Sequence, residues 1–144
     1  MSKEVLTWEG LDKLVQIAAN KVLTLDVDNI YGVPRGGIIP AIMLSYKTGL
    51  PIVKKPTRNT LIVDDICDSG DTLRDITRQT MVSGWKAYLF MSDAPYRTLT
   101  LYKRYSATFS PDVVINYLHD DRWIVFPWES IDDPTERDGT NITI

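Results

Sequence analysis

Residues 60–73, TLIVDDICDSGDTL, place an apolar run directly before a cluster of aspartates. The run TLIVDDI is rich in β-branched residues and does not alternate between polar and apolar positions, which predicts a strand covered on both faces. The small residues of DSGDT predict a turn, and the stretch 73–84 predicts a helix that ends at Gly84. This strand–turn–helix order is typical of an α/β protein.

A second unit of the same kind precedes the first. NIYGV (29–33) predicts a short strand, PRGG a turn, and IIPAIMLSYKTG an apolar helix that ends at Gly49. A helix at 8–23 is predicted after Thr7 as N-cap, and its apolar spacing selects a buried face of Leu11, Leu14, Val15 and Ala18.

Further short strands are predicted at 51–55, 85–91, 112–118 and 123–126. Strands that alternate with helices indicate a central, mostly parallel sheet flanked by helices, in a single α/β domain spanning residues 1–144. In such sheets ligands bind at the carboxyl ends of the strands, where the turns meet the helices.

Composition narrows the classes of function. A net charge of -3 argues against a general nucleic-acid-binding protein. The single cysteine, Cys67, excludes an intrachain disulfide and predicts a cytoplasmic location. No apolar run approaches the roughly 20 residues that a membrane span needs, and the N-terminal residues lack the apolar region of a signal peptide.

The aspartate cluster has the chemistry of a sugar-phosphate site. Amide groups of the turn at the start of a helix form a cradle for an anion, to which Ser69 and Thr72 add hydroxyl donors. Asp64 and Asp65 can accept hydrogen bonds from sugar hydroxyls or hold Mg²⁺. In the alternative interpretation the aspartates are solvated turn residues, with Asp71 and Ser69 capping the helix.

The stretch LIVDDICDSGDT resembles the 5-phosphoribosyl-1-pyrophosphate (PRPP) signature of type I phosphoribosyltransferases. The resemblance implies that Asp64 and Asp65 face the ribose hydroxyls and the Mg²⁺ ion. It also implies a 5′-phosphate site in the following turn, so the expected PRPP-binding residues are Asp64, Asp65, Asp68, Ser69, Gly70, Asp71 and Thr72. An acid at the Asp68 position is typical of the 6-oxopurine branch, where it handles the proton on N7 of the base, so Asp68 is the expected catalytic residue.

Two further segments resemble the same family. GVPRGGIIPA (32–41) is similar to its pyrophosphate loop, which implies a diphosphate contact by Arg35, Gly36 and Gly37. DDRWIVFPWES (120–130) is similar to the base-binding segment of the bacterial xanthine-guanine branch, a small C-terminal hood. Trp123 and Ile124 match its base-binding positions and Glu129 matches a second acid, whereas we interpret Trp128 as a packing residue.

Two features depart from the family pattern. The stretch 51–60 is too short for the flexible loop that normally closes over the reacting centre, although Lys54, Lys55 and Arg58 could help to neutralise pyrophosphate. The 6-oxopurine enzymes also carry a lysine for the purine O6 after the strand that follows the signature helix. With that strand at 85–91, the position falls on Ser92 or Asp93, so Arg97 or Lys103 would have to substitute.

The sequence therefore predicts a Mg²⁺-dependent, cytoplasmic phosphoribosyltransferase of purine salvage that transfers the phosphoribosyl group of PRPP to a 6-oxopurine-like base. A homodimer or homotetramer is expected, without nucleic-acid or membrane partners. The alternative is a PRPP- or nucleotide-binding regulatory protein of the same fold, which the short loop favours. A phosphatase-like protein with an aspartate nucleophile would explain the acids but neither PRGG nor the tryptophan segment.

Overall fold

The computed structural model of the chain describes residues 2–83 and 96–129. In that part of the chain the strands form two parallel sheets, one of four strands in the order β2-β3-β4-β5 and one of two, β1-β6. The elements are β1 (Lys3–Val5), α1 (Trp8–Val22), β2 (Asn29–Gly32), α2 (Ile38–Thr48), β3 (Thr60–Cys67), α3 (Asp71–Ser83), β4 (Tyr96–Arg104), β5 (Val113–Leu118) and β6 (Trp123–Val125).

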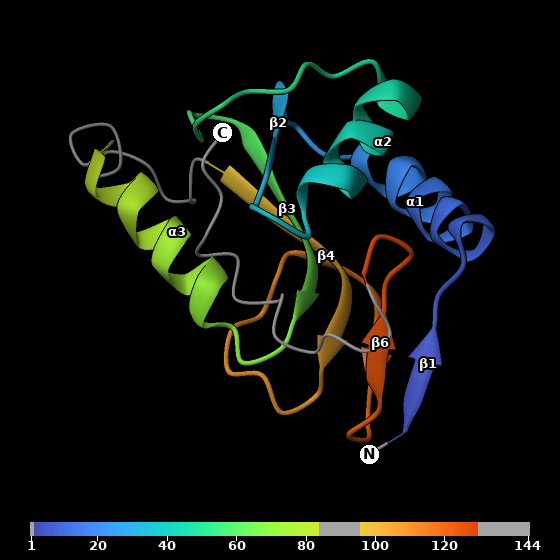
Figure 1. Cartoon of the computed structure of the whole chain (residues 1–144). Coiled ribbons are helices and arrows are strands. Elements are labelled where there is room, and N and C mark those ends of the chain that lie inside the picture. The colour runs from blue at the N-terminus through green and yellow to red at the C-terminus, as the bar shows by residue number, and fades with distance from the viewer. Residues whose placement is uncertain (1, 84–95, 130–144) are drawn as a thin grey trace.

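Helices cover both faces of the four-stranded sheet, with α1 and α2 on one side and α3 on the other (Figure 1). Strand β3 is central, and all eight of its residues are buried. Leu61 and Val63 belong to the core shared with α1 and α2, whereas Ile62 packs with Leu73 of α3. The predicted α/β fold, with β3 covered on both faces, is confirmed.

The two N-terminal helices form as their sequences predict. Thr7 Oγ1 accepts a hydrogen bond from Gly10 N at 3.0 Å and caps α1, and the predicted apolar face of this helix is buried. Helix α2 ends at Gly49, whose φ of 79° is in the left-handed region that favours glycine. The predicted stop of α3 at Gly84 lies outside the described residues.

The strand predictions need three corrections. The predicted strand 85–91 lies outside the described residues, and the strand beside β3 is β4, at Tyr96–Arg104, where none was predicted. The predicted strand 51–55 is reduced to one bridge between Ile52 and Ile30. Strand β1 was not predicted either, because its three residues gain their structure from β6, more than a hundred positions away.

The connection from α2 to β3 runs along the amino end of β3 (Figure 1). Asp28 N donates a hydrogen bond to Asn59 O at 2.8 Å, and Thr60 Oγ1 donates one to Asn29 Oδ1 at 2.6 Å. Both contacts lie at the start of β2 and β3. This connection is therefore separated by the length of β3 from the turn at its carboxyl end.

Candidate functional site

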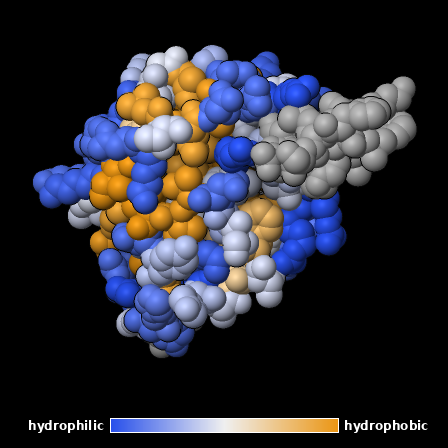
Figure 2. Space-filling model, turned by 180° about the vertical axis from the view of Figure 1, so that it is seen from behind, coloured by the Kyte–Doolittle hydropathy of each residue, from blue (hydrophilic) through white to orange (hydrophobic). Residues whose placement is uncertain are grey.

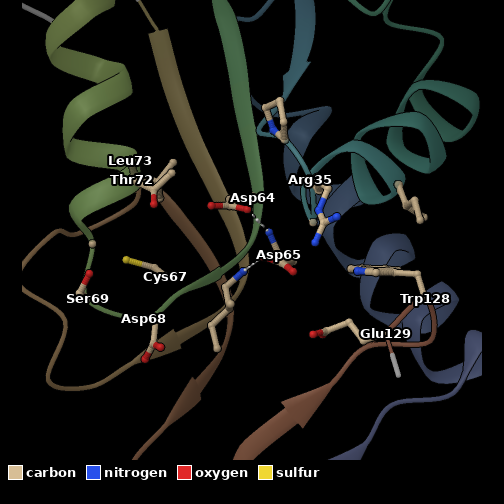
Figure 3. A pocket seen from close by; sticks show the side chains of 15 residues that line it. Arg35, Asp64, Asp65, Cys67, Asp68, Ser69, Thr72, Leu73, Trp128 and Glu129 are labelled. Atoms are coloured by element: carbon tan, nitrogen blue, oxygen red, sulfur yellow. Dashed lines mark hydrogen bonds between the residues drawn. The ribbon is translucent and has the colours of Figure 1, made fainter. Parts of the chain in front are cut away.

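A cavity of about 490 Å³ lies at the carboxyl end of β3. Three segments surround it: the loop between β2 and α2, the turn between β3 and α3, and the residues after β6 (Figure 3). Predicted site residues that line it are Arg35, Gly36, Asp64, Asp65, Asp68, Ser69, Gly70 and Thr72. Gly37, Asp71, Trp123 and Ile124 do not.

Asp64 and Asp65 are both only 8% exposed. Asp64 Oδ1 accepts a hydrogen bond from Asp65 N at 2.9 Å, and Asp65 Oδ1 accepts one from Ile66 N at 2.7 Å. Burial, and secondarily the neighbouring Asp65, raise the pKa of Asp64 well above its usual range. These two aspartates are therefore not solvated turn residues, and a cation or hydroxyl donor would relieve their electrostatic cost.

The turn after β3 presents backbone amides at the start of α3. Gly70 has a φ of 95°, and a β-carbon added there would be 2.5 Å from Phe109 Cβ, so glycine is required. Ser69 Oγ accepts a hydrogen bond from Asp71 N at 3.2 Å. The Asp71 carboxylate pairs instead with Arg74 at 2.8 Å. The side chain that caps this turn is therefore Ser69, and Asp71 has a structural contact away from the cavity.

The loop between β2 and α2 lies directly on the end of β3. Its Pro34–Arg35 peptide bond is cis. A β-carbon added at Gly37 would be 2.3 Å from Val63 O, so this glycine packs against the strand and not against the cavity. In Figure 3 Arg35 and Trp128 lie on one side of the end of β3, and the Asp64 carboxylate points to the other side, toward Thr72.

The tryptophans occupy places that differ from the sequence interpretation. Trp128, interpreted as a packing residue, lines the cavity and stacks on Phe126 at 4.9 Å between ring centroids. Trp123 lines a second, shallower hollow together with Asp68, which borders both. The Ile124 side chain is fully buried in the core, so only its backbone could reach a ligand. Glu129 lines the main cavity and accepts a hydrogen bond from Phe126 N at 3.0 Å.

Lys103 is the next-to-last residue of β4, which is the next strand after the signature helix within residues 2–83 and 96–129 and pairs with β3. Lys103 is therefore a candidate for the O6-binding lysine, whereas Ser92 and Asp93, to which the sequence assigned that position, lie outside the described residues. Lys103 is 7% exposed, and its Nζ donates to the carbonyls of Arg104 and Ala107, each at 3.1 Å. Arg97 lies near the amino end of β4, opposite Leu61, and is far from this position.

Other candidate chemistry is weaker. Burial raises the pKa of the Cys67 thiol to about 11, so a thiolate nucleophile is disfavoured.

Within 2–83 and 96–129, no three or more His, Cys, Asp or Glu side chains lie close enough together to hold a metal. Asp64 and Asp65 still fit Mg²⁺, which commonly binds one or two carboxylates together with phosphate oxygens of a substrate. None of the described helices is both long and apolar enough to cross a membrane.

The parallel sheet, the glycine loop and the acidic strand end resemble those of the type I phosphoribosyltransferases. The structure superposes on a purine phosphoribosyltransferase from Pyrococcus horikoshii with a TM-score of 0.75 and 26% identity, covering 90% of this chain and 95% of that one. In sequence, the chain is similar to the xanthine-guanine phosphoribosyltransferases of two bacteria. Identity is 24% for Vibrio atlanticus, covering 90% of both chains, and 23% for Chromohalobacter salexigens, covering 86% of this chain and 82% of the relative.

No family model matches the chain. The resemblance to the type I phosphoribosyltransferases, including the bacterial xanthine-guanine branch, is nevertheless confirmed by relatives and by fold.

Proposed function

We propose that this protein transfers the 5-phosphoribosyl group of PRPP to a 6-oxopurine-like base and releases pyrophosphate. The observation that carries the proposal is the buried Asp64–Asp65 pair, which lies in one cavity between the glycine loop and the turn before α3. A phosphate cradle, a pair of sugar-binding acids and a diphosphate loop together suit PRPP and few other metabolites.

Each part of the cavity has a role in holding PRPP. The amides of the turn and the amino end of α3 bind the 5′-phosphate. Asp64 and Asp65 accept hydrogen bonds from the ribose hydroxyls, and the loop at Arg35 and Gly36 faces the diphosphate. When bound, Mg²⁺ would neutralise charge on the diphosphate, held by Asp64, Asp65 and diphosphate oxygens.

The acceptor base would lie between Asp68 and Trp123. Asp68 borders both the PRPP cavity and the hollow that Trp123 lines, so a purine there would meet the anomeric carbon while stacking on the indole. Asp68 would share the N7 proton as the base nitrogen attacks. Lys103 is the residue that would supply a donor to O6, which favours a 6-oxopurine.

A regulatory protein that binds PRPP without turnover is the second candidate. The connection 49–59 lies at the amino end of β3, so within one chain it is distant from the cavity, and Lys54, Lys55 and Arg58 would reach a diphosphate only from a neighbouring subunit. Closure over the reacting centre normally excludes water. This feature favours the regulator, whereas Asp68, Trp123 and Lys103 favour the enzyme.

A pyrophosphate-release assay distinguishes the two candidates. The protein is mixed with Mg²⁺, PRPP and, in turn, guanine, xanthine, hypoxanthine and adenine. Release with one or more 6-oxopurines, reduced about a hundredfold in Asp68→Asn but not in the exposed control Asp75→Asn, is the expected result. Tight PRPP binding without release for every base would support the regulator, and no PRPP binding at millimolar concentration would overturn both.

Self-association and location complete the proposal. Apolar side chains gather over one area of the face opposite the view of Figure 1 (Figure 2), and exposed apolar side chains include those of Ile17, Ile42 and Ile52. Such an area commonly marks a protein–protein contact. We therefore propose a homodimer or homotetramer. The single cysteine supports a cytoplasmic location, and the similarity to xanthine-guanine phosphoribosyltransferases supports a role in purine salvage.

A further inference from the structure

We infer that Arg104 is a positioning residue that fixes the spacing between Asp68 and the segment leading to Trp123. Arg104 is the last residue of β4, and its side chain is only 14% exposed. Its Nε donates to Asp68 Oδ1 at 2.5 Å. This inference rests on the proposed function, because it concerns the place where the acceptor base would lie.

The same guanidinium also binds the other side of the hollow. Arg104 Nη1 donates to Asp120 O at 3.1 Å, and Nη2 donates to Arg122 O at 2.9 Å. Residues 119–122 have no helix or strand of their own and lead directly into β6 at Trp123. The planar Arg104 guanidinium, whose donors have a fixed geometry, therefore joins the turn after β3, at Asp68, to the segment 119–122 that precedes Trp123.

Asp68 depends on this contact for its orientation. Its side chain is 48% exposed, and in the described part of the chain its one ion-pair partner is Arg104. An aspartate on a turn otherwise has several open rotamers. The charge-assisted hydrogen bond selects one of them and directs the second carboxylate oxygen independently of the ligand.

Spacing across the hollow matters because the base must reach two groups at once. A planar ring that stacks on Trp123 can place N7 near Asp68 only when the two are held at a fixed separation. Displacement of a reacting group by about 1 Å can cost about a hundredfold in rate. Lysine could keep the contact with Asp68, but its single ammonium lacks the fork that reaches both carbonyls.

The kinetic test compares Arg104→Gln, Arg104→Lys and the matched control Arg122→Gln. Arg122 belongs to the same segment, 119–122. The control removes its ion pairs with Glu4 of β1 and with Asp120 but leaves the Arg122 carbonyl in place. We expect Arg104→Gln to lower kcat/KM for the base by about a hundredfold with little change in the KM for PRPP. Arg104→Lys should be intermediate, and Arg122→Gln should remain within about fivefold of the wild type.

Hydrogen exchange, measured without substrates, separates this inference from the proposed function. In Arg104→Gln, peptides covering 67–70 and 119–123 should both exchange faster, whereas Arg122→Gln should affect 119–123 alone. Unchanged exchange at 67–70 in Arg104→Gln and Arg104→Lys would overturn the inference, as would base kinetics equal to those of Arg122→Gln. If the wild type releases no pyrophosphate, the proposed function fails and the exchange data still decide whether Arg104 joins the two segments.

Discussion

Gly36 lies directly against Asp65, so that a β-carbon added at Gly36 would be 2.1 Å from Asp65 Oδ2. Real side chains essentially never approach so closely, and the carboxylate would have to move. The relationship ties the glycine loop to the acidic end of β3. In the proposed function, the side of the site that would hold the diphosphate is therefore in direct contact with the side that would hold the ribose.

Gly36→Ala should therefore weaken PRPP binding without unfolding the protein. The added methyl group displaces the Asp65 carboxylate and the loop amides together, so we expect a loss of about tenfold to a hundredfold in PRPP affinity. Titration calorimetry with PRPP and Mg²⁺ measures it. Gly49→Ala is a control for loss of a glycine, because no atom lies within 4 Å of a β-carbon there, and it should cost stability through its positive φ and leave PRPP affinity unchanged.

Asp64→Asn should stabilise the metal-free protein at neutral pH. Burial raises the pKa of Asp64 above its unfolded value, so its contribution to stability is complete below about pH 4 and is lost as the pH rises through the folded pKa. Asparagine remains an acceptor for Asp65 N but carries no charge. Thermal unfolding with a chelator, followed from pH 4 to pH 8, should show a higher Tm and a weaker pH dependence for the variant.

The exposed Asp75→Asn variant is the control for this experiment and should follow the wild-type curve. An Asp64→Asn protein that unfolds below the wild type at pH 7, with the same dependence on pH, would contradict the electrostatic account of Asp64.

Lys103→Gln should change the choice of base. Lysine at this position would donate to a 6-keto oxygen, so we expect kcat/KM to fall by about tenfold or more for a 6-oxopurine and to change little for adenine. The Tm should be recorded as well, because the Lys103 ammonium also holds two backbone carbonyls. Lys47→Gln, which removes an ion pair with Asp12 between the two helices, serves as the control. An equal loss of kcat/KM for both bases in Lys103→Gln would exclude a role of Lys103 in base selection.

Trp123→Leu and Trp128→Leu should separate the two sides of the site. Loss of stacking on Trp123 should raise the KM for the base by about tenfold to a hundredfold and spare the KM for PRPP. Trp128 lines the cavity with Arg35 and Asp65, so its variant should mainly affect PRPP. Initial-rate kinetics with each substrate varied in turn would show this, and the reverse pattern would exchange the roles of the two residues.

Much of the fold follows from local sequence. Strand β3, its turn and helix α2 were predictable because their apolar runs and glycines act within a few residues of one another. Strand β4 was missed although TLTL alternates leucine with β-branched threonine, as a strand does. Thr98 and Thr100 are nevertheless buried beside β3, so the alternation does not separate a buried face from an exposed one. With β4 unrecognised, Lys103 could not be placed at the carboxyl end of that strand.

The residues of the candidate site likewise fall into those that local sequence predicts and those that it does not. Asp64, Asp65 and the turn residues belong to one contiguous stretch, so sequence was sufficient to select them. Arg104 binds Asp68 across 36 positions, and Trp128 lies at the cavity while packed against Phe126 and Trp8. Contacts of that kind depend on how distant segments pack, and no local pattern reports them.

The pairing of β1 with β6 has a practical consequence for handling the protein. Trp123 N donates to Ser2 O at 2.8 Å, and Lys3 lies opposite Trp123 in the sheet. An affinity tag fused at the amino end therefore emerges beside the strand that carries this indole, and trimming the first five residues removes that strand's partner. Preparations that differ only in their N-terminal residues should therefore differ in their affinity for a purine.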